Sequence, residues 1–163
     1  MRQAYATLTV LVLFSGAATG TTYLVGSGRQ YQTLQQVATL LNPGDTVYVD
    51  GNQTYPGGVS FRRVGSAQNR IVIKGARING NRPIISGGTD GVHFRTDFPY
   101  TGPGADHYMF EGFEVTGATN RGIFHQSKDL ILRDVVVHHC QHGILGADQG
   151  SGSCLLEYSE VYS

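Results

Sequence analysis

A short segment recurs three times in the second half of the chain, and this repeat constrains the fold more than any other feature. Residues 110–115, 132–137 and 156–161 align without gaps, at offsets of 22 and 24 residues. Each segment consists of two short strand-like stretches separated by one residue: Gly112, Asp134 or Tyr158. A constant period of roughly 20 to 50 residues is the signature of a repeat architecture, in which each unit stacks on the next.

Each repeat has room for three short strands, which suits one coil of a parallel β-helix. A single coil cannot bury its own apolar positions, so successive coils stack at about 4.8 Å and share a continuous core. The sequence therefore predicts an all-β fold, a right-handed parallel β-helix built as a three-sheet solenoid. The side chains expected to face inward are those of Phe110, Phe113, Val115, Ile123, Leu130, Leu132, Val135, Val137 and Ile144.

The first part of the β-helix is less regular, and a short helix precedes it. Residues 31–41 place Leu34, Val37, Leu40 and Leu41 at helical spacing, and residues 42–44 (Asn-Pro-Gly) end the pattern. We expect this amphipathic helix to cap the open end of the solenoid, where apolar core and strand edges would otherwise be exposed. Further strands are expected at 46–49, 59–62, 71–74, 83–86 and 91–95.

Both ends of the sequence suggest processing or continuation. Residues 1–20 combine Arg2, the apolar run 8–14 and a series of small residues, which predicts a cleaved secretory signal and an extracellular or periplasmic protein. The mature β-helix would span residues 21–163, with no other segment able to cross a membrane. Because the last coil has no visible cap, we expect the chain to be an N-terminal fragment of a longer, monomeric protein.

Charge and cysteine content limit the possible partners. The net charge is zero, which argues against general nucleic-acid binding because such proteins usually carry a basic surface. A secreted chain permits a disulfide between Cys140 and Cys154. Two buried free thiols are an equally good interpretation, because cysteine also behaves as a small apolar residue.

Several segments resemble right-handed β-helix proteins of the pectate-lyase-like superfamily. Residues 43–49 and 53–58 resemble the start of that β-helix, and 69–75 followed by 82–87 resemble a further coil. The Gly-Ile and Leu-Ile-Leu-Arg-Asp-Val-Val-Val-His pattern of the later coils is also similar. The resemblance implies a polysaccharide partner, but the superfamily includes lyases, hydrolases, epimerases, esterases and non-catalytic surface proteins, so the fold does not choose among them.

The resemblance also implies that the substrate lies on one outer sheet, beside the insertion 96–107. The strands of this sheet would be 59–62, 92–95, 123–126 and 144–147. Two outward columns are expected, Ser60–His93–Phe124–Leu145 and Arg62–Arg95–Gln126–Ala147. β-Elimination on a uronate needs a cation for the carboxylate and a base for the adjacent proton. His93 and Arg95 are the catalytic candidates, and Arg62 and Gln126 are the substrate-binding candidates.

Other polar residues allow weaker hypotheses. Asp97, Asp106 and Asp148 could contribute carboxylates to a Ca²⁺ site. His138 and His139 are expected to face opposite sides of a strand, so that they would not share an ion, and His139 with His142 is interpreted as a histidine pair in a turn. Glu111, Arg133 and Glu157 should stack as a structural charge ladder; they are aligned in the repeats.

The leading hypothesis is a secreted polysaccharide lyase-like enzyme acting on an acidic, uronate-containing polysaccharide. One alternative is a glycoside hydrolase on the same fold. Another is a non-catalytic glycan-binding module or surface adhesin. No residue set in the sequence matches the catalytic motif of a known lyase family, so the residues alone leave these alternatives open.

Overall fold

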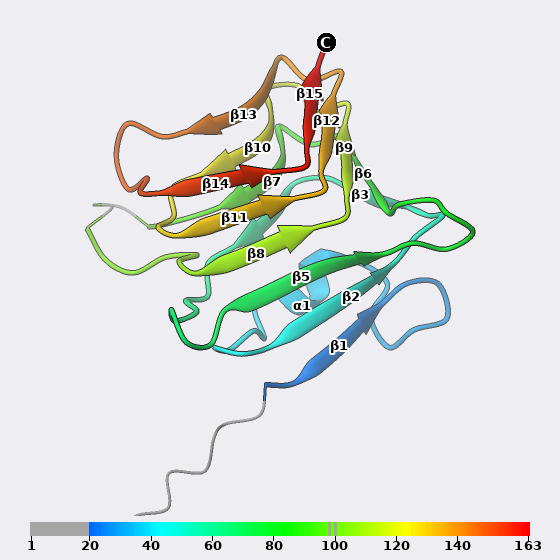
Figure 1. The fold of residues 1–163 in the computed structure, drawn as a ribbon, viewed down its shortest axis with the longest axis horizontal. Coiled ribbons are helices and arrows are strands. Elements are labelled where there is room, and N and C mark those ends of the chain that lie inside the picture. Colours follow the sequence, from blue (N-terminus) through cyan, green and yellow to red (C-terminus); the bar gives the residue numbers. More distant parts are fainter. Residues whose placement is uncertain (1–19, 98, 100) are drawn as a thin grey trace, which may run out of the picture.

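The computed structural model describes residues 20–163 apart from residues 98 and 100, so the predicted signal sequence lies outside the described part except for its last residue. Parallel strands form three sheets, shown in Figure 1. Sheet A contains β1 (Thr22–Val25), β2 (Thr46–Asp50), β5 (Ile71–Ala76), β8 (Tyr108–Glu111), β11 (Leu130–Arg133) and β14 (Cys154–Glu157). Sheet B contains β3 (Thr54–Pro56), β6 (Ile84–Ser86), β9 (Glu114–Thr116), β12 (Val136–His138) and β15 (Glu160–Tyr162). Sheet C contains β4 (Val59–Phe61), β7 (Asp90–Phe94), β10 (Arg121–His125) and β13 (His142–Gly146).

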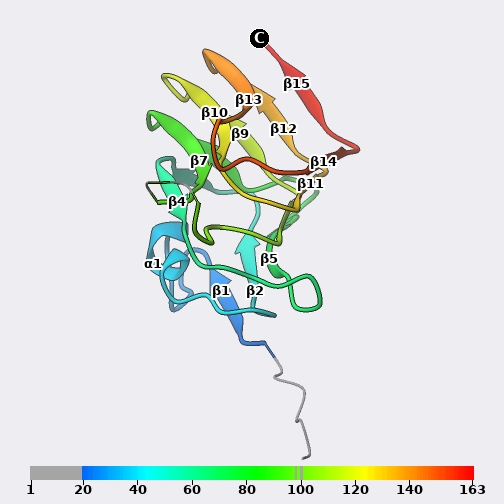
Figure 2. The ribbon, with the colours of Figure 1, turned by 90° about the vertical axis from the view of Figure 1, so that its left-hand side faces the viewer.

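From β2 onwards the chain visits sheets A, B and C in turn, so that each full circuit adds one strand to each sheet. Phe110, Leu132 and Leu156 are direct partners on β8, β11 and β14, which is the register that the repeat predicts. The predicted right-handed parallel β-helix is therefore confirmed. In Figure 2 the coils rise from β1 at the lower end to β15 beside the C-terminus.

One residue makes the corner between sheets A and B in the last three coils. Gly112, Asp134 and Tyr158 have φ angles of 79°, 51° and 49°, all in the left-handed region. That conformation costs a non-glycine residue about 1–2 kcal/mol. The repeated corner nevertheless turns the chain so that the next residue, such as the buried Phe113, points into the core.

Aromatic side chains fill the centre of the solenoid. Phe110 stacks on Phe113 at 4.2 Å between ring centroids, and Phe94 contacts Phe61, Tyr108 and Phe110 at 5.4–5.8 Å. The predicted inward-facing residues are buried, with the exception of Ile144, which is only partly buried. Ile144 lies on β13, and no strand pairs with the outer edge of β13 in the described part of the chain.

A short helix closes the N-terminal end, as predicted, but it is shorter than the sequence pattern suggests. Helix α1 spans Leu34–Ala38, where residues 31–41 were expected. Leu34, Val37 and Leu41 are buried, whereas Leu40, beyond the end of the helix, is 42% exposed. Sheet C begins at β4, and α1 packs against that strand (Figure 2). No helix among the described residues is long and apolar enough to cross a membrane.

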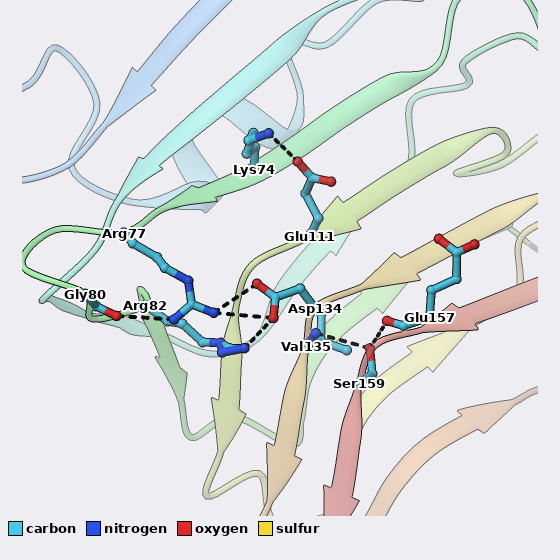
Figure 3. Close-up of polar contacts among 9 residues, drawn as sticks. All are labelled: Lys74, Arg77, Gly80, Arg82, Glu111, Asp134, Val135, Glu157 and Ser159. Atoms are coloured by element: carbon cyan, nitrogen blue, oxygen red, sulfur yellow. Dashed lines mark hydrogen bonds and ion pairs between the residues drawn. The ribbon is translucent and has the colours of Figure 1, made fainter.

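The charge ladder on the outer face of sheet A is confirmed and begins one coil earlier than expected. Glu111 forms ion pairs with Lys74 at 2.6 Å and with Arg133 at 3.9 Å, and Arg133 pairs with Glu157 at 2.7 Å. At the adjacent corner, Arg77 and Arg82 both bind the Asp134 carboxylate (Figure 3). These contacts link residues from four coils, and each exposed pair contributes at most about 1 kcal/mol.

The two cysteines are both free thiols. Cys140 is partly buried in the link between β12 and β13, and Cys154 is exposed at the start of β14. The structure therefore has the unpaired thiols of the second interpretation, but the expectation that both are buried is wrong.

A buried histidine should make the stability of the fold depend on pH. His125 continues the inward column of Phe61 and Phe94 and is 6% exposed. Burial lowers the pKa of His125 below its usual 6.5, so below about pH 6.5 the unfolded chain binds more protons than the folded one. We expect the free energy of unfolding to fall as the pH decreases from 7 to 5, and to fall less in His125→Phe. Denaturant titrations of both proteins at the two pH values measure this difference, and equal losses in both would contradict it.

Candidate functional site

The outer face of sheet C has the register that the sequence predicts. Ser60 pairs with His93, His93 with Phe124, and Phe124 with Leu145, so these residues form one outward column. The residues of the second column come directly after the last residue of each strand: Arg62, Arg95, Gln126 and Ala147. The amides of Arg95, Gln126 and Ala147 donate hydrogen bonds of 2.7–3.0 Å to the strand of the preceding coil and extend the ladder.

A depression of about 260 Å³ lies over β4 and β7 on this face. Its polar lining comes from Ser60, Arg62, Thr89, Asp90, His93 and Arg95. Three of the four predicted site residues therefore share one depression. The fourth, Gln126, contacts it through His93, because His93 Nε2 lies 3.0 Å from Gln126 Oε1.

His93 lies in a polar and partly apolar environment. Its Nδ1 atom is 3.7 Å from Asp90 Oδ2, and its ring centroid is 4.6 Å from that of Phe124. Burial lowers the pKa of His93, and the hydrogen bond to Gln126 and the Asp90 charge oppose this only in part. His93 is therefore neutral near pH 7 and able to accept a proton, which is the property that a general base needs.

Two arginines of the depression converge on one carboxylate. Arg62 Nη1 lies 2.6 Å from Asp97 Oδ1, and Arg95 Nε lies 3.5 Å from the same oxygen. The Asp97 side chain is 63% exposed, so this contact point faces solvent. The geometry shows that the two guanidinium groups can hold one carboxylate between them; we call Arg62 and Arg95 the arginine clamp.

The structure adds a second ion pair that the sequence interpretation missed. Arg121 binds Asp90 through two hydrogen bonds of 2.6 and 2.9 Å, and its guanidinium carbon lies 3.6 Å from the Phe124 ring centroid. Asp90 and Arg121 are direct partners on β7 and β10. Asp90 precedes Gly-Val and Arg121 precedes Gly-Ile. An alignment of these two dipeptides in successive coils would have predicted that the opposite charges lie side by side.

The three aspartates considered for calcium make different contacts. Asp97 binds the arginine clamp, and buried Asp106 accepts a hydrogen bond of 2.8 Å from the Lys128 amide. Asp148 is exposed in the turn after β13. Residues 20–163, apart from 98 and 100, contain no group of three or more His, Cys, Asp or Glu residues placed to hold a metal ion. Calcium binding thus stays a prediction.

A larger hollow of about 430 Å³ lies beside the charge ladder, over Gly75 and Gly112. Its carboxylates, Glu111 and Asp134, are already bound by lysine and arginine side chains, as Figure 3 shows. Because these charges neutralise one another, they serve as ion pairs between coils and leave no free charge to bind a ligand in the hollow. The outer face of sheet C therefore remains the better candidate site.

The three parallel sheets define a right-handed parallel β-helix, and two solved lyase structures share this fold. The chain is similar to the crystal structure of an alginate lyase from Paenibacillus sp. str. FPU-7, with a TM-score of 0.59 and 16% identity over 90% of this chain and 59% of that one. It is also similar to pectate lyase Pel9A, with a TM-score of 0.56 and 19% identity over 90% of this chain and 39% of that one. No protein-family model and no curated protein matches the sequence.

These likenesses confirm the predicted fold at the level of architecture. The chain spans about three fifths of the alginate lyase and two fifths of Pel9A. At such low identity the shared fold does not transfer an activity, because one fold supports many functions. The chemistry must therefore be argued from the depression itself.

Proposed function

We propose that this chain is part of a secreted polysaccharide lyase-like protein that binds a uronate polysaccharide on the outer face of sheet C. The observation that carries the proposal is the arginine clamp, since Arg62 and Arg95 already hold the exposed carboxylate of Asp97. A uronate carboxylate of the substrate would replace Asp97 between the two guanidinium groups. Arginine suits this role because its planar donors match the geometry of a carboxylate.

The same depression offers a base for elimination. With the substrate carboxylate neutralised by the clamp, the adjacent C–H becomes acidic enough for neutral His93 to remove its proton. The electron pair left on that carbon forms the new double bond, and the bond to the leaving sugar oxygen breaks. That oxygen takes up a proton from water. Support also comes from the names of the two similar structures, which refer to alginate and pectate, both polyuronates.

Incubation with alginate, polygalacturonate and a neutral polymer such as dextran tests the activity. We expect an unsaturated product, detected by its ultraviolet absorbance, from a polyuronate and not from dextran. New reducing ends without unsaturation would indicate the hydrolase alternative. Binding without any cleavage would indicate the glycan-binding module. Loss of activity with a chelator would show that calcium, rather than the clamp alone, neutralises the substrate carboxylate.

Removing the internal competitor should strengthen uronate binding. In Asp97→Asn the arginine clamp loses its carboxylate, and the interaction of an exposed pair is worth up to about 1 kcal/mol. We therefore expect the Kd for an oligouronate, measured by calorimetry, to fall by up to about fivefold. Glu160→Gln is the matched control, because Glu160 is an exposed carboxylate outside the depression. Weaker binding in Asp97→Asn than in the control would contradict the clamp.

A further inference from the structure

Two consecutive histidines face each other on sheet B, away from the depression. His138 is the last residue of β12, and His139 begins the link to β13. Their Nδ1 atoms lie 2.5 Å apart, and their rings are nearly perpendicular at 79°. The expectation that they face opposite sides is wrong, because His139 adopts a left-handed backbone with a φ angle of 49°, which ends the alternation of the strand.

The surroundings of His138 fix which of its nitrogens is free to bind. Glu114, on the neighbouring strand β9, places Oε1 3.0 Å from His138 Nε2. A carboxylate at this nitrogen retains the hydrogen there, so the lone pair is left on Nδ1, which points at His139. The Tyr162 ring stacks on His138 at 5.1 Å and 5° and limits its rotation. A histidine with a carboxylate at one ring nitrogen and a lone pair on the other is typical of metal-binding histidines.

We propose that His138 and His139 bind a divalent first-row transition-metal ion through their Nδ1 atoms, with Cu²⁺ as the best fit. Imidazole nitrogens suit Cu²⁺, Ni²⁺ and Zn²⁺, and Cu²⁺ binds tightest in that series. Two cis nitrogens about 2.0 Å from an ion in square-planar geometry lie about 2.8 Å apart, against about 3.3 Å for a tetrahedral ion. Starting from 2.5 Å, copper needs the smaller movement, and the exposed His139 can supply it.

The protein supplies two ligands to this site. Thr116 Oγ1 lies 3.3 Å from His138 Nδ1, so it is placed to hydrogen-bond a ligand water. Because the described chain has no third His, Cys, Asp or Glu grouped with the pair in a way that could hold a metal, water completes the coordination. With only two protein ligands, such a site holds an exchangeable ion. Its ligands are nitrogen atoms, whereas a calcium site uses oxygen atoms.

Copper titration of the full, untagged chain tests the proposal by calorimetry and electron paramagnetic resonance. We expect one Cu²⁺ per chain, with splitting from coordinated nitrogen. His139→Asn should weaken binding at least about tenfold, and asparagine tolerates the left-handed backbone. Glu114→Gln should weaken it by about tenfold through the orientation of His138.

His142→Asn is the matched control, because His142 is an exposed histidine three residues further along, at the start of β13. It should bind copper within about twofold of the unaltered chain. Circular dichroism of each variant confirms that the β-helix is retained. Copper binding by His139→Asn equal to that of the unaltered chain, or no nitrogen signal in the unaltered chain, would overturn the proposal.

Discussion

Phe110→Ala is expected to lower the free energy of unfolding by about 3–5 kcal/mol, the range found for removing a buried aromatic side chain. Phe110 is fully buried on β8, between β5 and β11 of sheet A. Its ring contacts Phe113 and Phe94, so removal of the ring would leave a cavity among the aromatic side chains of two coils. Neighbouring coils stabilise each other mainly through such contacts. Chemical denaturation followed by circular dichroism measures the loss.

Met109→Ala, one residue earlier on the same strand, is the matched control. The Met109 side chain points out of the solenoid and is partly exposed, so its truncation should cost roughly 1 kcal/mol or less. Both variants change one large apolar residue of β8 to alanine, and only the inward one opens a core cavity. Equal losses in the two variants would show that the alternation of β8 does not determine what is buried.

The parts of the fold that the sequence predicts are those that depend on local periodicity. The inward positions of β8 and β11 follow from alternation along each strand, and their register follows from the repeat. The single-residue turns at Gly112, Asp134 and Tyr158 are also predicted, since these residues occupy the same place in each repeat, whereas their positive φ angles come from the structure. Ladder contacts such as Glu111 with Arg133 then follow directly from the register.

Features that depend on the path of a link between strands could not be predicted in this way. Asp97 was considered as a calcium ligand, but the loop that follows β7 brings it to Arg62 and Arg95. His139 was placed by strand alternation, although its left-handed backbone rotates its side chain towards His138. In both cases the decisive variable is the backbone conformation just after a strand end, which the periodicity of the strands does not encode.

His93→Gln is expected to reduce the rate of elimination by about 10²–10⁴-fold, the usual contribution of a general base. Glutamine keeps a similar length and a hydrogen-bonding group near Gln126, but it cannot accept the substrate proton at neutral pH. Because Arg62 and Arg95 remain in place, oligouronate binding should change little, so that kcat falls while KM is nearly retained. This prediction rests on the proposed lyase activity.

The pH profile separates a base from a residue that only shapes the depression. The pKa of His93 is lowered from 6.5 by burial, so the elimination rate of the unaltered protein should rise with pH through a midpoint below 6.5 and then level off. In His93→Gln this rising limb should disappear, whereas His142→Asn, outside the depression, should retain both the rate and the limb. A variant with a reduced rate but an unchanged rising limb would show that another group takes the proton and that His93 serves only to position the substrate.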